Sequence, residues 1–234
     1  MRTRILLAAA ASALVFASSA SAVVVYSATT ETGTRANPGA DTAFFDDVFL
    51  TNSNTLGAYA LEVTKITVGV RRLANAPATD VTFYYTSNTD DGVAPNLETF
   101  VTPVSTIGTT SLAVNGGSSL TQLVTQGDGV TPLFTVPLDT TEDANDGMFY
   151  IGLSLSNANG NSGWRVVSDA NSFDAFHVVT LSTQTNEGIY SFGDPTNSPG
   201  NFYTIVEGNL QVPEPASASL IGLAGMAMIR RRRA

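Results

Sequence analysis

Hydrophobic and polar residues alternate over short segments of this chain, a pattern that predicts β-strands with one buried face. The clearest segment is 149–155, in which Phe149, Ile151, Leu153 and Leu155 are separated by polar or small residues. Segment 81–85 alternates in the same way. Further strands are expected at 44–50, 120–124, 133–136, 164–167, 176–181, 189–192 and 202–206.

One apolar segment, residues 61–70, changes phase along its length. Leu61 and Val63 share one parity, whereas Ile66 and Val68 share the other. A strand can keep all four on one face only if an extra residue is inserted between them. The sequence therefore predicts either a β-bulge near Lys65 or two shorter strands.

These short strands are separated by segments rich in Gly, Asn and Asp, and no segment between residues 23 and 212 has the period of an amphipathic helix. We expect an all-β fold for this region, an antiparallel β-sandwich with a jelly-roll-like arrangement. It would be flanked by an N-terminal signal helix and a short C-terminal membrane helix. A propeller would need internal repeats, which we do not find.

The first 22 residues have the organisation of a secretory signal peptide. Arg2 and Arg4 form a basic start, residues 5–17 form an apolar run, and Ala20-Ser21-Ala22 is a small-residue cleavage pattern. We expect cleavage after Ala22. An uncleaved membrane anchor is the alternative, and the short apolar run makes it the weaker one.

The last 22 residues combine three features. Pro213-Glu214-Pro215 comes first, followed by an uncharged run at 216–229 and the cluster Arg230, Arg231, Arg232 and Arg233. A helix over the run would be roughly 20 Å long, shorter than the ~30 Å hydrocarbon core of a bilayer. We expect a temporary membrane segment with its arginines on the cytoplasmic side. The prolines keep the motif extended and open to a protease. An ordinary frayed C-terminus is the alternative.

This arrangement resembles the PEP-CTERM sorting signal, over residues 212–234. In that family an exosortase, a membrane transpeptidase, is thought to recognise the motif and remove the tail. The resemblance implies that Pro213, Glu214 and Pro215 are recognition residues and that Arg230 to Arg233 form a retention cluster. It implies export, transient anchoring in the inner membrane, and a role at the cell surface with exopolysaccharide or biofilm. The body is loosely similar to jelly-roll domains found before such tails, through Asp46-Asp47-Val48 and the segment 63–85.

The acidity of the chain restricts its partners. The full chain has a net charge of −9, and loss of the two end segments removes six arginines and Glu214, which leaves −14. Such a surface repels nucleic acid and anionic lipid, and it suits divalent cations and neutral polysaccharide better. Because the chain has no cysteine, the exported domain has no disulfide to stabilise it.

A candidate calcium site precedes the strand at 149–155. Glu142, Asp143, Asn145 and Asp146 lie close together before Gly147. Calcium takes six to eight oxygen ligands, and these side chains with nearby carbonyl groups could supply part of that set. The spacing does not match the EF-hand. The alternative is a solvated acidic turn, and no other cofactor is expected.

A candidate sugar-binding platform surrounds the single tryptophan. Trp164 and Arg165 lie within a polar segment, and Tyr84 would face outward if Val81 and Phe83 face the core. Sugars bind exposed aromatic rings flanked by hydrogen-bonding groups. The alternative is a partly buried tryptophan that only packs.

Catalytic signals are weak, so we expect a non-enzymatic protein. His177 is the only histidine, lies on an expected strand and is interpreted as structural. No Gly-x-Ser-x-Gly motif occurs. The leading hypothesis is a structural or adhesive component of the extracellular matrix. The alternatives are a carbohydrate-binding module acting on exopolysaccharide and, less well supported, a secreted glycan hydrolase using a carboxylate pair.

Overall fold

The structure is a computed structural model that describes residues 22–51, 58–72, 78–87, 102–112, 121–138, 145–157, 162–168, 176–190 and 201–212. The regular structure throughout these residues is antiparallel β-strand, which confirms the all-β prediction. Within them, no helix of the length and apolarity needed to cross a bilayer is found. The expected end helices fall on residues 1–22 and 213–234, of which only Ala22 is described.

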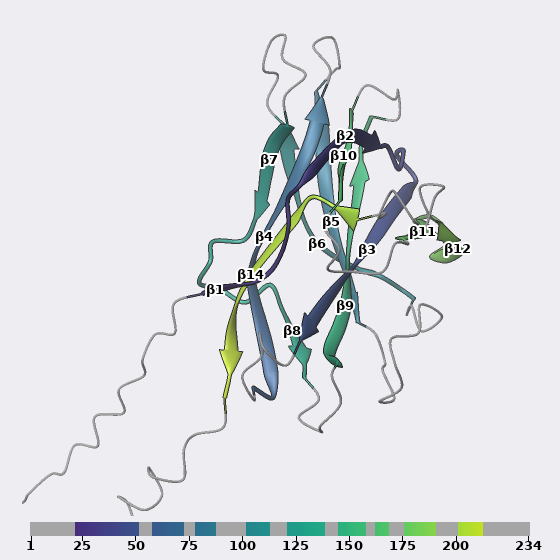
Figure 1. Ribbon diagram of the computed structural model, residues 1–234. Helices are drawn as coiled ribbons and strands as arrows, with labels where there is room; N and C mark the ends of the chain where they lie inside the picture. The colour runs from purple at the N-terminus through teal and green to yellow at the C-terminus, as the bar shows by residue number, and fades with distance from the viewer. Residues whose placement is uncertain are drawn as a thin grey trace, which may run out of the picture.

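The described strands form two sheets (Figure 1). The eight-stranded sheet contains β1 (Val23–Ala28), β2 (Glu31–Ala36), β4 (Ala60–Arg72), β7 (Thr121–Gln126), β8 (Phe134–Pro137), β10 (Ser162–Val167), β13 (Asn201–Phe202) and β14 (Thr204–Gln211). The six-stranded sheet has the order β12 (Thr185–Tyr190), β11 (Phe176–Thr180), β3 (Thr42–Thr51), β9 (Asn145–Leu155), β5 (Thr79–Ser87) and β6 (Ser105–Leu112).

A single main hydrophobic core joins the two sheets. Val68 of β4 and Val206 of β14 contribute from the eight-stranded sheet, and Phe83 of β5 and Ile151 of β9 contribute from the six-stranded sheet. All four side chains are fully buried. Because each strand turns alternate side chains inward, apolar residues two positions apart remove a continuous surface from water, and this burial is the main stabilising contribution.

The predicted change of phase in β4 is a β-bulge at Thr64. The register of β4 on β14 skips this residue, which lies between Val63 and Lys65. The backbone carbonyl of Thr64 accepts a hydrogen bond from Gly129 N at 3.2 Å. The bulge is therefore confirmed, and the alternative of two shorter strands is wrong because β4 is continuous.

The alternation does not predict β1, β2 or β6. In β1 a shift of register between Val24 and Tyr26 makes both Val25 and Tyr26 buried, so the period of two is broken. The sequences of β2 and β6 are rich in Thr, Ser and Gly, and β6 buries only Leu112 fully. Strands at the edge of a sheet need few apolar residues, so hydrophobic pattern alone does not reveal them.

The start of the first strand and the end of the last strand lie toward one end of the eight-stranded sheet. β1 begins at Val23 beside the last part of β14, which ends at Gln211. At the opposite end of the same sheet, β4 ends at Arg72 opposite Ser162, the first residue of β10. We call these the terminal end and the distal end; in Figure 1 the terminal end is at the bottom and the distal end at the top.

Candidate functional site

The exposed platform predicted at Trp164 is not formed. Trp164 is 0% exposed, and its ring stacks on Phe202 with centroids 4.3 Å apart. Its Nε1 donates a hydrogen bond to the carbonyl oxygen of Tyr203 at 3.0 Å. Trp164 shares the core-facing parity of β10 with Val166. The platform prediction was therefore wrong on this point, and the packing alternative is correct.

Tyr84 points away from the main core, as predicted, but it is buried as well. It belongs to a second hydrophobic cluster on the outer face of the six-stranded sheet, formed by Ala43, Phe45, Tyr84, Tyr150 and Val179. Its hydroxyl lies 3.1 Å from the Ser154 hydroxyl. Tyr84 and Trp164 stand on different sheets and neither ring is open to a sugar, so the structure does not bring them together as one site.

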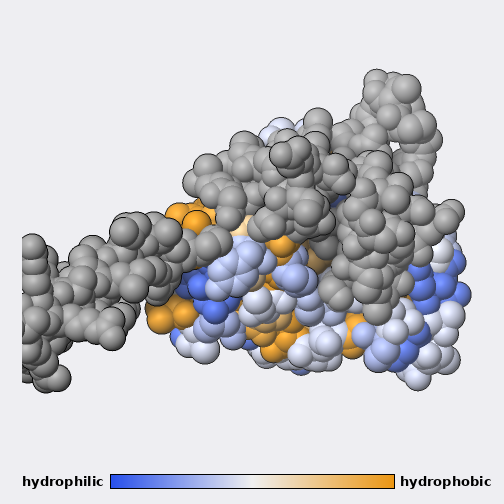
Figure 2. Space-filling model, turned by 90° about the horizontal axis from the view of Figure 1, so that it is seen from below, coloured by the Kyte–Doolittle hydropathy of each residue, from blue (hydrophilic) through white to orange (hydrophobic). Residues whose placement is uncertain are grey.

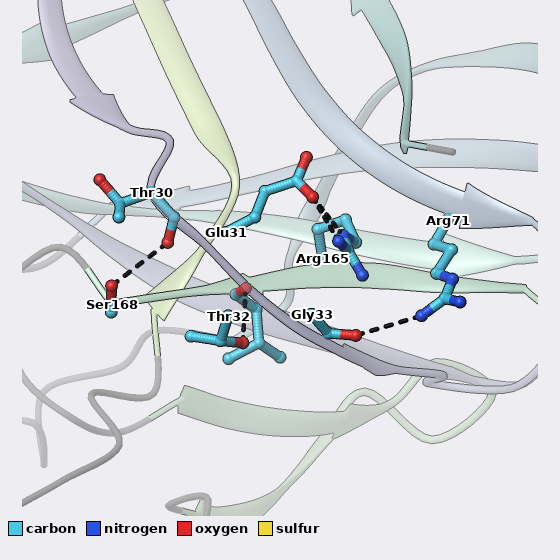
Figure 3. Close-up of polar contacts among 8 residues, drawn as sticks. Thr30, Glu31, Thr32, Gly33, Arg71, Arg165 and Ser168 are labelled. Atoms are coloured by element: carbon cyan, nitrogen blue, oxygen red, sulfur yellow. Dashed lines mark hydrogen bonds and ion pairs between the residues drawn. The ribbon is translucent and has the colours of Figure 1, made fainter. Parts of the chain in front are cut away.

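Arg165 lies on the outer face of the eight-stranded sheet, because its neighbour Trp164 faces the core. Strand β2 pairs with β10 in the same sheet and places Arg35 opposite Arg165. The Glu31 carboxylate accepts hydrogen bonds from Arg165 Nε, at 3.0 Å, and from Nη2 (Figure 3). Arg165 is thus held in place by a charged partner on a neighbouring strand.

Four arginines, Arg35, Arg71, Arg72 and Arg165, lie on strands at the distal end, and we call them the arginine group. Arg35, Arg71 and Arg165 are on the outer face of the sheet, whereas Arg72, next to Arg71 on β4, has the core-facing parity of Val68 and Val70. Arg35 lies opposite Arg165 in the β2–β10 register. Arg71 and Arg72 lie opposite the first two residues of β10. Arg35 and Arg71 are partly exposed, whereas Arg72 and Arg165 are buried. Of these four arginines, only Arg165 was predicted as a site residue, since the other three are distant from it along the chain.

The arginine group contains one acidic neighbour, Glu31, whose pKa reflects its position. Burial favours the neutral carboxyl, but the nearby Thr121 hydroxyl and the Arg165 guanidinium outweigh burial. The charges of Arg165 and Arg71 act in the same direction. Together these groups lower the pKa of Glu31, so it remains a carboxylate at neutral pH.

Polar contacts also fix β2 beside β10 and β4 (Figure 3). Arg71 Nη1 donates a hydrogen bond to the Gly33 carbonyl oxygen at 3.1 Å. Thr32 Oγ1 donates to the Val166 carbonyl oxygen at 3.0 Å. Because these bonds join β2 to both β4 and β10, the arginines stand on a rigid part of the sheet rather than on a loop.

A second polar cluster lies on the outer face of the six-stranded sheet. Asp47 is opposite Tyr150 in the register, and the Tyr150 ring contacts His177 edge-on at 5.1 Å. Asn186 Nδ2 lies 3.0 Å from His177 Nδ1. Burial, and then the charge of Asp47, raise the pKa of Tyr150. The side chains of Asp47, Tyr150 and His177 are each at most 1% exposed. Their burial supports a structural interpretation of the histidine.

Asp46 points in the other direction, between the sheets. Its Oδ2 accepts a hydrogen bond from Phe202 N at 2.9 Å, which links β3 to β13. Its Oδ1 is buried and has no hydrogen-bond partner in the described part of the chain. Burial and the neighbouring Asp47 charge raise the pKa of Asp46 well above its usual value.

The calcium prediction is only partly covered by the described residues. Asn145 is the first residue of β9 and pairs with Thr51, and the register then skips Asp146. Glu142 and Asp143 lie outside the described residues. No group of three or more His, Cys, Asp or Glu residues that could hold a metal ion occurs within the described ranges. The calcium site stays a prediction.

The sorting and processing residues lie almost entirely outside the described ranges. These are Ala20, Pro213, Glu214, Pro215, Arg230, Arg231, Arg232 and Arg233. Ala22 is described and immediately precedes β1, and Val212 immediately follows β14. The folded domain therefore comes within one residue of the motif, and the roles of these residues stay predictions.

Comparison with protein-family models, with curated proteins and with solved structures found no match to this chain.

Proposed function

We propose that this protein is exported, held briefly in the inner membrane by residues 213–234, and then processed at Pro213–Pro215 by an exosortase-type transpeptidase. Its β-domain would then serve as a structural or adhesive component of the extracellular matrix. The observation that carries the proposal is the order of motif, apolar run and arginine cluster at the C-terminus, together with a signal peptide at the other end.

The position of the start of β1 and the end of β14 supports this proposal. Both predicted membrane segments adjoin the terminal end of the eight-stranded sheet, so one end of the domain would face the bilayer. Four exposed apolar side chains occur there: Val23, Val24, Tyr59 and Val212. Tyr59 is placed there because its N donates to the Gln211 carbonyl oxygen at 2.9 Å. Figure 2 views the molecule from below and shows hydrophobic areas in orange on this surface.

The proposal includes a non-catalytic domain with a jelly-roll-like arrangement, flanked by a signal helix and a C-terminal membrane helix. The repeated passage of the chain between sheets, at β3–β4, β4–β5 and β9–β10, is the feature that favours a jelly roll. The burial of Asp46, Asp47 and His177 favours structural roles for these groups. A binding module built on Trp164 is no longer supported, because the ring is buried.

The test is the mass and location of the protein in an exosortase-containing host. The native chain is compared with a variant in which Pro213, Glu214 and Pro215 are replaced by alanine, and with a second variant carrying Gln at positions 230–233. We expect the native protein outside the cell at the mass of a chain lacking both end segments. The alanine variant should stay in the membrane at the mass expected without the signal peptide.

The glutamine variant separates anchoring from recognition. Without the arginines the protein should no longer be retained in the membrane. The exported protein should then have a mass that still includes the complete C-terminal tail. If the native protein keeps its arginines and remains in the membrane, the tail is a plain anchor and the proposed function is wrong.

A further inference from the structure

Exposed apolar side chains gather at the terminal end of the eight-stranded sheet. In the described part of the chain seven large hydrophobic side chains are exposed, and four of them lie there: Val23, Val24, Tyr59 and Val212. We call these four side chains the terminal surface. Each is between 48% and 58% exposed, so together they leave apolar area in water that a partner would remove.

Backbone pairing fixes the positions of these residues. Tyr59 N donates a hydrogen bond to the Gln211 carbonyl oxygen at 2.9 Å, and the Tyr59 carbonyl oxygen accepts one from Leu138 N at 2.9 Å. Val23 lies opposite Gly208, three residues before Gln211 and therefore about 10 Å from it along the strand. The terminal surface is thus displayed by paired backbone from β1, β14 and the residues beside β4 and β8.

The segments that form this end of the sheet are uncharged. No Asp, Glu, Lys or Arg occurs in residues 22–24, 58–61, 136–138 and 209–212. On β4 and β14 the nearest charged side chains are Glu62 and the ion pair of Lys65 with Glu207, at 2.6 Å. Glu62 stands two residues inward from Ala60, which leaves an uncharged layer about 7 Å deep.

The position of residues 213–234 in the chain indicates what covers the terminal surface. Val212 is followed directly by this segment, whose uncharged run is placed in the inner membrane by the proposed function. The run begins at Ala216, and four residues of extended chain reach at most about 14 Å. Because a run of 14 residues is already short for the hydrocarbon core, it has no spare length to hold the domain away from the bilayer.

The chemistry of the terminal surface fits the interfacial layer of a bilayer. Tyrosine favours this layer, because its ring is apolar and its hydroxyl reaches the polar headgroups. The valines gain from removal of their apolar area from water. Without the two end segments the chain has a net charge of −14, which anionic lipid would repel. Zwitterionic headgroups are therefore the matching lipid class.

We propose that the terminal surface docks on the interfacial layer of a zwitterionic lipid bilayer, so that the β-domain makes its own membrane contact. This docking rests on the proposed function, because residues 213–234 bring the domain to the membrane. A short apolar segment and a small apolar surface are each weak anchors, and two weak signals together hold a protein more firmly than one. The contact would also hold Pro213 at the bilayer surface.

The test uses a fluorescent label at a single cysteine, which the absence of native cysteine allows. Full-length Tyr59→Cys and Leu123→Cys chains carry an environment-sensitive fluorophore in phosphatidylcholine vesicles that contain a shallow spin-labelled lipid. Leu123 is the matched control: it is 60% exposed on the same sheet but pairs with Gly69, about 30 Å along β4 from Ala60. We expect quenching at position 59 to exceed that at position 123 by about threefold.

A second comparison separates docking from simple closeness to the C-terminal segment. With the label at position 59, Val23→Ser/Val24→Ser should reduce quenching by about half, whereas Leu123→Ser should leave it unchanged. A six-residue Gly-Ser spacer after Val212 should preserve quenching, because the surface itself has affinity for lipid. Thermal unfolding of each variant shows whether the fold is retained, and Val212→Ser, outside the strands, is a further replacement.

Equal quenching at positions 59 and 123 would overturn the docking, as would loss of quenching with the spacer. A blue shift of the label at position 59 that depends on protein concentration without vesicles would also overturn it, since a second copy would then cover the surface. Stronger quenching in anionic vesicles would overturn the choice of lipid. Flotation with vesicles but without quenching would contradict the docking alone, whereas absence of flotation would contradict both the docking and the anchoring in the proposed function.

Discussion

Asp46 shows how a single residue connects the two sheets. It carries a carboxyl group into the interior, where Oδ2 accepts a hydrogen bond from Phe202 N and Oδ1 is buried. A buried carboxylate without a cation is costly, so the neutral form is favoured and the pKa is raised. This position therefore makes the stability of the domain depend on pH.

We predict that Asp46→Asn stabilises the domain increasingly as pH rises. The unfolded residue ionises near pH 3.9, whereas the folded residue ionises at higher pH. Above pH 4 the unfolded state therefore binds fewer protons, and native stability falls as pH rises. Asparagine keeps an acceptor for Phe202 N and does not ionise. The gap in Tm between variant and native chain should widen from pH 4 to pH 8.

Asp128→Asn is the matched control, with the opposite dependence. Asp128 accepts hydrogen bonds from the backbone N of Thr131 and Val130, and these bonds lower its pKa. The stability it contributes is present at neutral pH and is lost as pH falls through its folded pKa. The Tm penalty of this variant should therefore shrink on acidification. A gap for Asp46→Asn that narrows with rising pH would contradict the prediction.

The burial of individual side chains was harder to predict than the face of the strand to which they point. Strand β10 has apolar residues at both parities, since Val166 faces the core with Trp164 while Val167 is also buried. Its local sequence therefore does not say which face is covered. The burial of Arg165 depends on Glu31, which lies 134 residues away along the chain. No pattern within a short window reports such a contact.

At the scale of elements, the bulge in β4 was predictable because it changes the parity of buried residues. The hydrogen-bond donor to the Thr64 carbonyl oxygen in the bulge was not predictable, because it is Gly129 N, in the turn after β7. Gly127 there has φ +94° and lies against the Thr64 carbonyl oxygen. A side chain at Gly127 would be strained by this φ and would overlap that oxygen.

We predict that Gly127→Ala destabilises the domain by about 2–4 kcal/mol, from backbone strain and displacement of the bulge. Gly129→Ala is the control: its φ is +79°, but the nearest atom to an added methyl group is Lys65 Cδ, at 3.9 Å. This variant should cost only about 1 kcal/mol. Urea unfolding of both variants measures the difference. Equal costs would show that the contact with Thr64 contributes nothing.

At the scale of the whole molecule, the fold class followed from the sequence, whereas the arginine group did not. Alternating apolar residues dictate strands, and strands with one apolar face must pair into a sandwich. The arginine group depends on which strands become neighbours, and that order is set by contacts between residues far apart in sequence. Arg35, Arg71 and Arg165 come from three separate strands and meet only through the registers of β10.

The short distance in sequence between the folded domain and the proposed sorting motif, residues 213–215, also belongs to this scale. β14 ends at Gln211, so Pro213 starts two residues later, within about 7 Å of the end of the strand. In the proposed function, a membrane protease would therefore work next to the terminal end of the domain. We predict that a six-residue Gly-Ser spacer between Val212 and Pro213 speeds processing, because it moves the motif up to about 20 Å from the folded strands.

Pulse-chase labelling in an exosortase-containing host measures this rate as the loss of the full-length form. The same spacer combined with alanine at Pro213, Glu214 and Pro215 is the control, and it should abolish processing. If the spacer alone slows processing, the enzyme reads the end of the domain as well as the motif. In that case Tyr59 and Val212, exposed beside Gln211, would be the residues to replace next, since they are the apolar groups that an enzyme at the bilayer surface would meet first.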